Sequence, residues 1–155
     1  MKYRLALCLL ALTVATPALA CPTLPDLPAV QATLIRDLNA QRRTNGLPAL
    51  TASAALTTTA QSLACDNAAR RTVVHTGSNG STLKARLAAQ GYRYSNAAEN
   101  AAAGYPDAAT VAAGWMSSPG HRRNILSPPL REIGVGVAKG PDGLLYWIID
   151  LGAPR

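Results

Sequence analysis

Three side chains of this sequence could act together on water or on a metal ion: His75, Glu99 and His121. The chain has two histidines, and each stands in an irregular stretch typical of a loop, His75 before Thr-Gly and His121 after Ser-Pro-Gly. Glu99 is the single carboxylate in a run of small residues over 97–104, and a buried carboxylate needs a partner. Two imidazoles and one carboxylate suit a zinc-like ion with an open water position, or a general-base pair that acts on water.

The spacing of these residues does not by itself bring them together. Glu99 lies 24 residues after His75 and 22 residues before His121, unlike a His-Glu-x-x-His motif, in which one helix places the ligands side by side. In the alternative interpretation, both histidines bond to backbone groups in loops, and Glu99 pairs with an arginine. The residue types alone leave both interpretations open.

Helical spacing of apolar residues, with start and stop signals, predicts four helices that would position these side chains. The expected helices are residues 29–44 after Pro28, a second from a cap at Thr51 or Ser53 to Arg70-Arg71, a third from a cap at Ser81 to Gly91, and a fourth that opens at Pro106-Asp107 and carries Val111 and Trp115. Residues 73–80, which contain His75, are expected to form a loop.

The C-terminal part of the chain changes to the two-residue period of strands. The alternating apolar residues are Ile133, Val135 and Val137, then Leu145, Trp147, Ile149 and Leu151, on either side of a turn at 140–143. Helices followed by an antiparallel hairpin, without repeated strand-helix-strand units, predict an α+β domain in which helices pack on a small sheet. A length of 155 residues allows one such domain.

Residues 1–20 have the pattern of a secretory signal peptide. Lys2 and Arg4 form a positive head, an apolar run follows over 5–14, and Ala18-Leu19-Ala20 matches a cleavage site. We therefore expect a secreted or periplasmic protein, with an extended lead-in over 21–28 and one folded domain over 29–155. The apolar run is short for a transmembrane helix, and no later stretch reaches the roughly 18 apolar residues that a span needs, so no membrane span is expected.

Export would leave two cysteines, Cys21 and Cys65, because Cys8 lies in the signal. In an oxidising compartment such a pair predicts one disulfide, and closing a loop of 44 positions would stabilise the fold by about 4 kcal/mol on the chain-entropy model. The alternative is a lipid anchor on Cys21. Lipoprotein signals usually carry Leu three residues before the cysteine, where this sequence has Ala18, so we favour the disulfide.

Composition excludes several classes of protein. Hydrophobic residues make up 48% of the chain and charged residues 15%, which excludes a disordered chain and a coiled coil. Without Lys2 and Arg4, 13 basic and 8 acidic side chains remain, a net charge of +5 that favours attraction to an anionic envelope polymer. The arginine pairs at 42–43, 70–71 and 122–123 are interpreted as surface and salt-bridge residues at helix ends. They lack interleaved aromatic residues, so no nucleic-acid partner is expected.

Four stretches, taken in order, resemble the CAP superfamily of cysteine-rich secretory, venom-antigen and plant pathogenesis-related proteins, in its compact bacterial SCP-like form. The stretches are Leu38-Asn39 through Arg42 with 46–50; His75-Thr76-Gly77 with Arg86 and Gly91-Tyr92; Ala98-Glu99-Asn100; and 115–126, followed by 133–138 and Tyr146-Trp147. Together they cover about residues 29–151.

The resemblance implies a three-layer α-β-α sandwich, with a small antiparallel sheet between helices and a central cleft. In the family two histidines and two acidic residues line this cleft. His75, Glu99 and His121 fall on three of the positions, and Ser118, three residues after Trp115, holds the second acidic position. This departure leaves His75 and His121 as the expected metal ligands, with Glu99 orienting a bound water or a histidine ring.

The same resemblance implies a secreted binding module for a lipid, sterol-like, envelope-polymer or protein ligand, with a divalent, zinc-like ion as the one cofactor considered. The alternative is an extracellular hydrolase, in which a His-bound metal or a His-Glu pair activates water. A third interpretation is a structural envelope protein. A Ser118 nucleophile is disfavoured because no Gly-x-Ser-x-Gly turn surrounds it.

Overall fold

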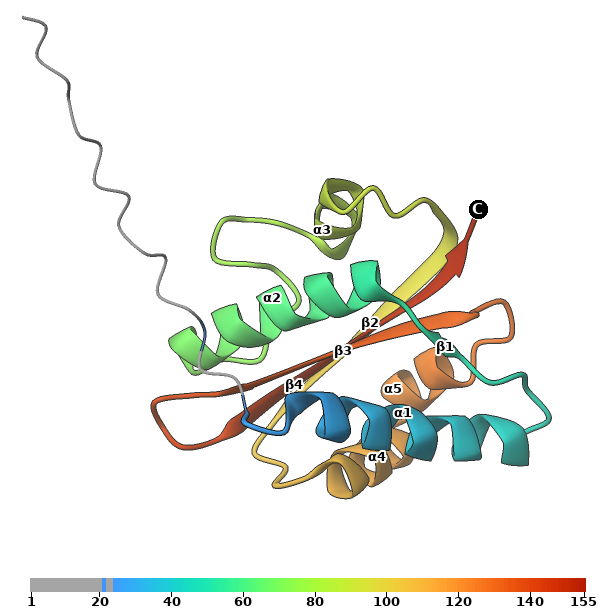
Figure 1. Ribbon diagram of the computed structural model, residues 1–155, viewed down its shortest axis with the longest axis horizontal. Helices are drawn as coiled ribbons and strands as arrows, with labels where there is room; N and C mark the ends of the chain where they lie inside the picture. The colour runs from blue at the N-terminus through green and yellow to red at the C-terminus, as the bar shows by residue number, and fades with distance from the viewer. Residues whose placement is uncertain (1–20, 22–23) are drawn as a thin grey trace, which may run out of the picture.

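The computed structural model describes Cys21 and residues 24–155, so the expected signal peptide lies outside the described residues (Figure 1). Within the described residues, five helices and four strands follow one another. They are α1 (Leu27–Thr44), β1 (Thr51–Ala52), α2 (Ala54–Arg70), α3 (Leu83–Ala89), β2 (Tyr94–Ala103), α4 (Ala108–Ser117), α5 (Pro119–Ile125), β3 (Glu132–Lys139) and β4 (Leu145–Pro154).

The four strands form one sheet in the order β1-β3-β4-β2. The predicted antiparallel hairpin is confirmed as β3 and β4, and β2 pairs antiparallel with the other side of β4. The two-residue strand β1 runs parallel to β3, so the sheet is not wholly antiparallel as expected. Strand β2 was not predicted, because its alanines favour helix. Pairing along the whole length of β4 overrides that local preference.

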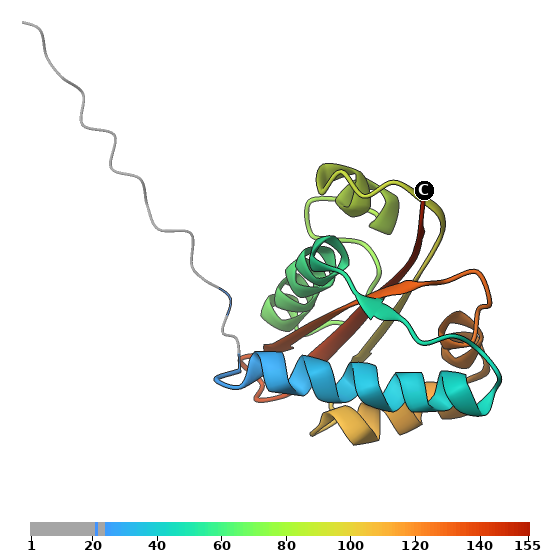
Figure 2. The ribbon, with the colours of Figure 1, turned by 45° about the vertical axis from the view of Figure 1, so that its right-hand side comes forward.

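The helices cover both faces of the sheet and confirm the α+β sandwich. Figures 1 and 2 show α2 and α3 on one face and α1, α4 and α5 on the other. Helix α2 lies directly on the glycines of β3, since a Cβ atom on Gly134 would collide with the backbone of Leu56 and one on Gly136 with the backbone of Ala60. The α2 layer is therefore held at a fixed, short distance from the sheet.

The two faces have cores of different size. On the α1 and α4 face, the large side chains of Leu34, Leu38, Trp115 and Trp147 are buried. On the α2 face, the core consists mainly of alanines with Tyr146 and Ile148. The larger aromatic side chains therefore anchor the α1 and α4 layer, whereas small residues let α2 approach closely.

Several element boundaries differ from the prediction. Helix α1 begins at Leu27, two residues earlier than expected, and Pro28 occupies its first turn, where a missing N–H costs little. The cap of α3 is Thr82, whose hydroxyl accepts from the Ala85 amide, and not Ser81. Residues 119–125 form the short helix α5, so His121 lies in a helix and not in an irregular segment.

Arg42 corrects the interpretation of the arginine pairs as surface residues. Its side chain is fully buried between α1 and the segment after α5. The guanidinium donates to four backbone carbonyls, those of Pro48 at 2.9 Å, Ile125 at 2.7 Å, Ser127 at 3.1 Å and Leu130 at 3.1 Å. Four charge-assisted bonds of this kind fix the segment after α1 to the segment after α5.

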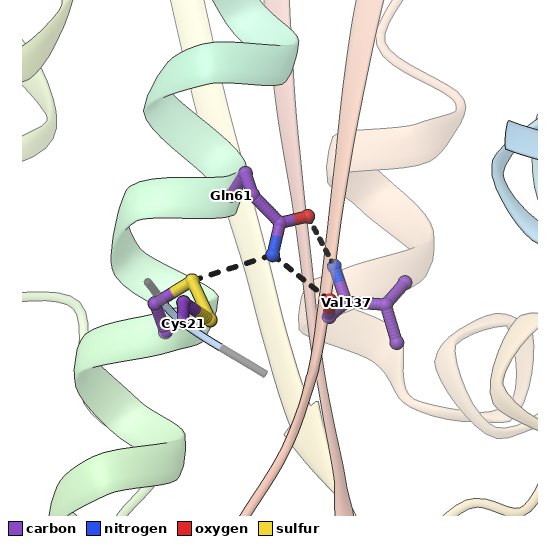
Figure 3. Close-up of a disulfide and its surroundings, with 4 residues drawn as sticks. Cys21, Gln61 and Val137 are labelled. Atoms are coloured by element: carbon purple, nitrogen blue, oxygen red, sulfur yellow. Dashed lines mark hydrogen bonds between the residues drawn. A yellow bond between two sulfur atoms is a disulfide. The ribbon is translucent and has the colours of Figure 1, made fainter. Parts of the chain in front are cut away.

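The predicted disulfide between Cys21 and Cys65 is confirmed, with Cα atoms 5.5 Å apart (Figure 3). It lies beside Gln61, whose side-chain amide accepts from the Val137 N–H at 3.0 Å and donates to the Val137 carbonyl at 2.9 Å. The bridge therefore ties the start of the domain to α2 next to an open edge of β3. A sulfur held in this bridge is not free to carry a lipid thioether, so the alternative of an anchor on Cys21 does not fit the structure.

Within residues 24–155, no helix is both long enough and apolar enough to cross a bilayer.

Candidate functional site

His75 and Glu99 meet, although 24 residues separate them. The loop between α2 and α3 carries His75 to β2, where its Nδ1 lies 2.8 Å from Oε1 of Glu99. The His75 side chain is 61% exposed, whereas that of Glu99 is 4% exposed. The carboxylate is therefore a buried support that holds one nitrogen of an accessible imidazole ring and leaves Nε2 free to bind.

Arg86 of α3 completes this support. Its Nη2 donates to Oε2 of Glu99, and its Nη1 donates to the backbone carbonyls of His75 at 3.2 Å and Ser81 at 2.9 Å. The guanidinium thus neutralises the buried carboxylate and fixes the loop that carries His75. The expected pairing of Glu99 with an arginine is therefore confirmed, and the same carboxylate also bonds to His75.

Asp150 is a site residue that sequence reasoning missed. It lies directly opposite Glu99 on β4, is fully buried, and accepts a hydrogen bond from the Thr59 hydroxyl at 2.5 Å. Burial, and then the charge of Glu99, raise the pKa of Asp150 well above its usual range, which favours the neutral acid. The sequence offered one signal for it, because Asp150 is the one charged residue in the apolar stretch 145–151.

His121 is positioned from the opposite face of the same strand. Asn100, which follows Glu99 on β2, is fully buried and donates from Nδ2 to the His121 carbonyl at 3.1 Å. Asn124 of α5 donates to Oδ1 of Asn100 at 2.8 Å. Because successive side chains of a strand point to opposite faces, Glu99 and Asn100 hold the two histidines from the two sides of the sheet.

The two histidines differ in basicity. The hydrogen bond to Glu99 raises the pKa of His75, against the opposing effect of its partial burial. Burial, and then the positive charge of His75, lower the pKa of His121. His121 is therefore the more readily neutral of the two histidines.

Ser118 lies at the N-terminal end of α5, three residues before His121. Its side chain does not cap the helix, and among the described residues no hydrogen bond joins its hydroxyl to either histidine or to Glu99. The structure thus brings His75, Glu99 and Arg86 into direct contact and leaves Ser118 outside that hydrogen-bonded group.

The donor set suits at most two protein ligands to a metal ion. Nε2 of His75 and the imidazole of His121 are available, but both oxygens of Glu99 already have partners. Within the part of the chain that is described, no group of three or more His, Cys, Asp or Glu side chains is arranged to hold an ion. An ion held by these two imidazoles would take its other ligands from solvent, unlike an ion in a closed structural site.

Comparison with known proteins gives one family. A model of the cysteine-rich secretory protein family, CAP, matches residues 35–151. The uncharacterized protein YkwD of Bacillus subtilis (strain 168) is 33% identical over 98 residues, which are 63% of this chain and 38% of that protein. The chain therefore spans about two fifths of the length of this relative.

Two solved structures have the same fold. An outer surface protein of Borrelia burgdorferi is 22% identical with a TM-score of 0.71, over 80% of this chain and 92% of that one. An extracellular SCP-domain protein of Bacillus anthracis str. Ames is 24% identical with a TM-score of 0.73, over 84% of this chain and 44% of that one. One of these proteins is thus an outer surface protein and the other an extracellular one, and the present chain contains a disulfide.

Proposed function

Because the chain belongs to the CAP family of cysteine-rich secretory proteins, we propose that it is an exported binding module whose ligand site is formed around His75 and His121. The expected signal peptide would deliver it outside the cytoplasm, where the Cys21–Cys65 bridge is stable. Family membership supports the class of protein, and the geometry around Glu99 favours a binding function over a catalytic one.

The engagement of both Glu99 oxygens is the observation that favours binding. A general base needs a free carboxylate or imidazole nitrogen within reach of the water that it activates. Here one oxygen of Glu99 bonds to His75, the other bonds to Arg86, and the side chain is almost completely buried. Glu99 therefore orients the His75 ring and does not act as a base.

A divalent, zinc-like ion fits this site as a bound ligand held by His75 Nε2 and by His121. The carboxylate bond to Nδ1 fixes the His75 ring and raises its basicity, as carboxylates that support metal-binding histidines do. Metal binding requires neutral imidazoles, and the lowered pKa of His121 favours that form. When bound, the ion would supply an open coordination position for an oxygen atom of the ligand.

Of the ligand classes expected for the family, an apolar one is supported by a pocket of about 420 Å³ where the N-terminal turns of α1 and α4 meet β4. Leu24, Val30, Leu145 and Trp147 line it together with Asp26 and Asp107, and neither histidine lines it. Its apolar part suits the chain or ring system of a lipid or sterol-like molecule. The hydrolase alternative would instead need a water activated by Nε2 of His75 or bound to a metal ion, because both oxygens of Glu99 already have partners.

The test is zinc binding by calorimetry to the exported, disulfide-bonded protein at neutral pH. We expect binding of one ion per chain, lost in His75→Ala and in His121→Ala. Ser118→Ala is the matched control and should bind like the wild type, because its hydroxyl contacts neither histidine nor Glu99. No zinc binding by the wild type, or equal binding by all variants, would remove the metal from the proposal.

A second measurement separates binding from hydrolysis. The zinc-loaded protein is incubated with exported esters, peptides and cell-wall fragments, and the products are followed by mass spectrometry. We expect no turnover above that of His75→Ala. Turnover that falls by orders of magnitude in His75→Ala would contradict the binding module and establish the hydrolase.

A further inference from the structure

A second feature of the molecule points to a ligand, and it lies away from the His75 side of β2. The buried Arg42 donates only to backbone carbonyls, and no ion pair joins it to a carboxylate among the described residues. Carbonyl dipoles satisfy its hydrogen bonds without cancelling its charge. The segment after α5, which wraps this guanidinium, therefore carries an uncompensated positive charge beneath it.

A pocket of about 520 Å³ lies over that segment. Arg122 and Arg123 of α5 contribute to its wall, together with Ser127, whose carbonyl binds Arg42 from beneath. Pro119, Leu126 and Pro128 give the pocket an apolar surface beside these charges. The pocket thus combines two guanidinium groups with hydrocarbon.

The charges of this pocket are all of one sign. No aspartate or glutamate lines it, and within residues 24–155 neither Arg122 nor Arg123 takes part in an ion pair. Arg122 donates to the neutral amide oxygen of Asn45 at 3.4 Å, which leaves its charge uncompensated. Arg42, which does not line the pocket, adds a third positive charge behind the Ser127 carbonyl. A low-dielectric concavity lined by one sign of charge concentrates ions of the opposite sign.

We propose that this pocket binds the phosphate group of an amphiphile, with Arg122 and Arg123 on the phosphate oxygens and the hydrocarbon against Leu126, Pro119 and Pro128. A phosphate has enough terminal oxygens to accept from two guanidinium forks at once, whereas one fork saturates a carboxylate. Nucleic acid is a poorer fit, because the lining has no aromatic side chain on which a base could stack. This site goes beyond the histidine site, and the failure of either proposal would leave the other standing.

The test is calorimetry with dodecyl phosphate below its critical micelle concentration, on the exported, disulfide-bonded protein at low ionic strength. The affinity should fall about tenfold or more in the double variant Arg122→Gln, Arg123→Gln. In the wild type, amide signals of Leu126 and Ser127 should shift on binding. Circular dichroism checks that the variants fold, which is expected because both side chains are exposed.

The matched control is the double variant Arg93→Gln, Arg155→Gln. These exposed arginines are also neighbours, since the Arg155 amide donates to the Arg93 carbonyl at 3.0 Å, and their loss removes the same net charge. The control should change the affinity less than about twofold. Equal losses in both double variants would overturn the site, because they would show attraction to the net charge alone.

Two further probes test the parts of the ligand. Inorganic phosphate should bind more weakly than dodecyl phosphate, since it lacks the hydrocarbon, and uncharged dodecyl maltoside should not compete. If inorganic phosphate binds as tightly as dodecyl phosphate, the proposed role of the hydrocarbon is wrong. If dodecyl maltoside binds as tightly as dodecyl phosphate, the proposed role of the phosphate group is wrong.

Discussion

Each face of the sheet buries one arginine, and the two are stabilised in different ways. Arg42, on the α1 face, donates to four backbone carbonyls. Arg86, on the α2 and α3 face, donates to the carboxylate of Glu99 and to two carbonyls. Both cations are almost completely withdrawn from water, and breaking the bonds of such a buried cation is strongly destabilising.

The two arginines differ in whether their hydrogen-bond partners respond to pH. Backbone carbonyls neither gain nor lose a proton, so the surroundings of Arg42 stay constant across the physiological pH range and serve to fix loops. The partner of Arg86 also bonds to His75 and faces Asp150, so its surroundings respond to pH. The fold therefore has a rigid arginine on one face and, on the other, an arginine linked to the candidate site.

The largest expected effect comes from removing the rigid arginine. Arg42→Met keeps much of the side-chain volume but removes four charge-assisted hydrogen bonds, of which those to Ile125 and Leu130 are fully buried, so we expect the free energy of unfolding to fall by about 4 kcal/mol. Urea unfolding measures this loss. Its neighbour Arg43 is exposed, and Arg43→Met should cost less than about 0.5 kcal/mol. Similar losses in the two variants would contradict the role given to Arg42.

Removing the linked arginine should cost less and should move a second observable. Arg86→Met removes three hydrogen bonds instead of four, and the buried Glu99 keeps His75 as a partner, so we expect a loss of about 2 to 3 kcal/mol at neutral pH. The positive charge of Arg86 lowers the pKa of His75, so that pKa should rise in the variant, as measured by NMR titration. Arg70→Met, which breaks the more exposed pair with Asp66, is the control. An unchanged pKa of His75 would contradict the electrostatic effect of Arg86 on the candidate site.

The same contrast explains what could be predicted from the sequence. The helices, the hairpin, the sandwich, the disulfide and the meeting of His75 with Glu99 follow from periodicity, from capping residues and from the family resemblance. Each of those signals is local or belongs to a recurring motif. The two buried arginines belong to stretches that carry the resemblance, but their burial has no local signal, because Arg42 resembles its exposed neighbour Arg43 at the end of the same helix.

Long-range pairing accounts for the other differences. Strand β2 consists of residues that favour helix and becomes a strand only because β4 offers a complete set of partners. Asp150 looks like an exposed polar position until α2 closes over it and Thr59 binds its carboxyl group. These features depend on which elements come together in three dimensions, information that residue spacing alone does not contain.

The smallest expected effect concerns pH and compares the two histidines. The folded pKa of His75 lies above its ordinary value of 6.5, so its stabilisation is complete below that pH and is lost as the pH rises through the folded pKa. The gap in free energy of unfolding between wild type and His75→Gln should thus be larger at about pH 5.5 than at about pH 8.5. Because the side chain is 61% exposed, we expect this change to be below about 1 kcal/mol.

His121 should show the opposite sign. Its folded pKa is lowered, so protonation favours the unfolded chain, and the stability that wild type holds relative to His121→Gln should decrease as the pH falls through 6.5. Urea unfolding of both variants at several pH values measures the two slopes, and Arg42→Met, whose carbonyl partners do not titrate, should show neither slope. Slopes of the same sign for the two histidines would mean that Glu99 does not set the charge of His75. The proposed contrast between a rigid face and a pH-dependent face would then be wrong, because it depends on the bond between His75 and Glu99.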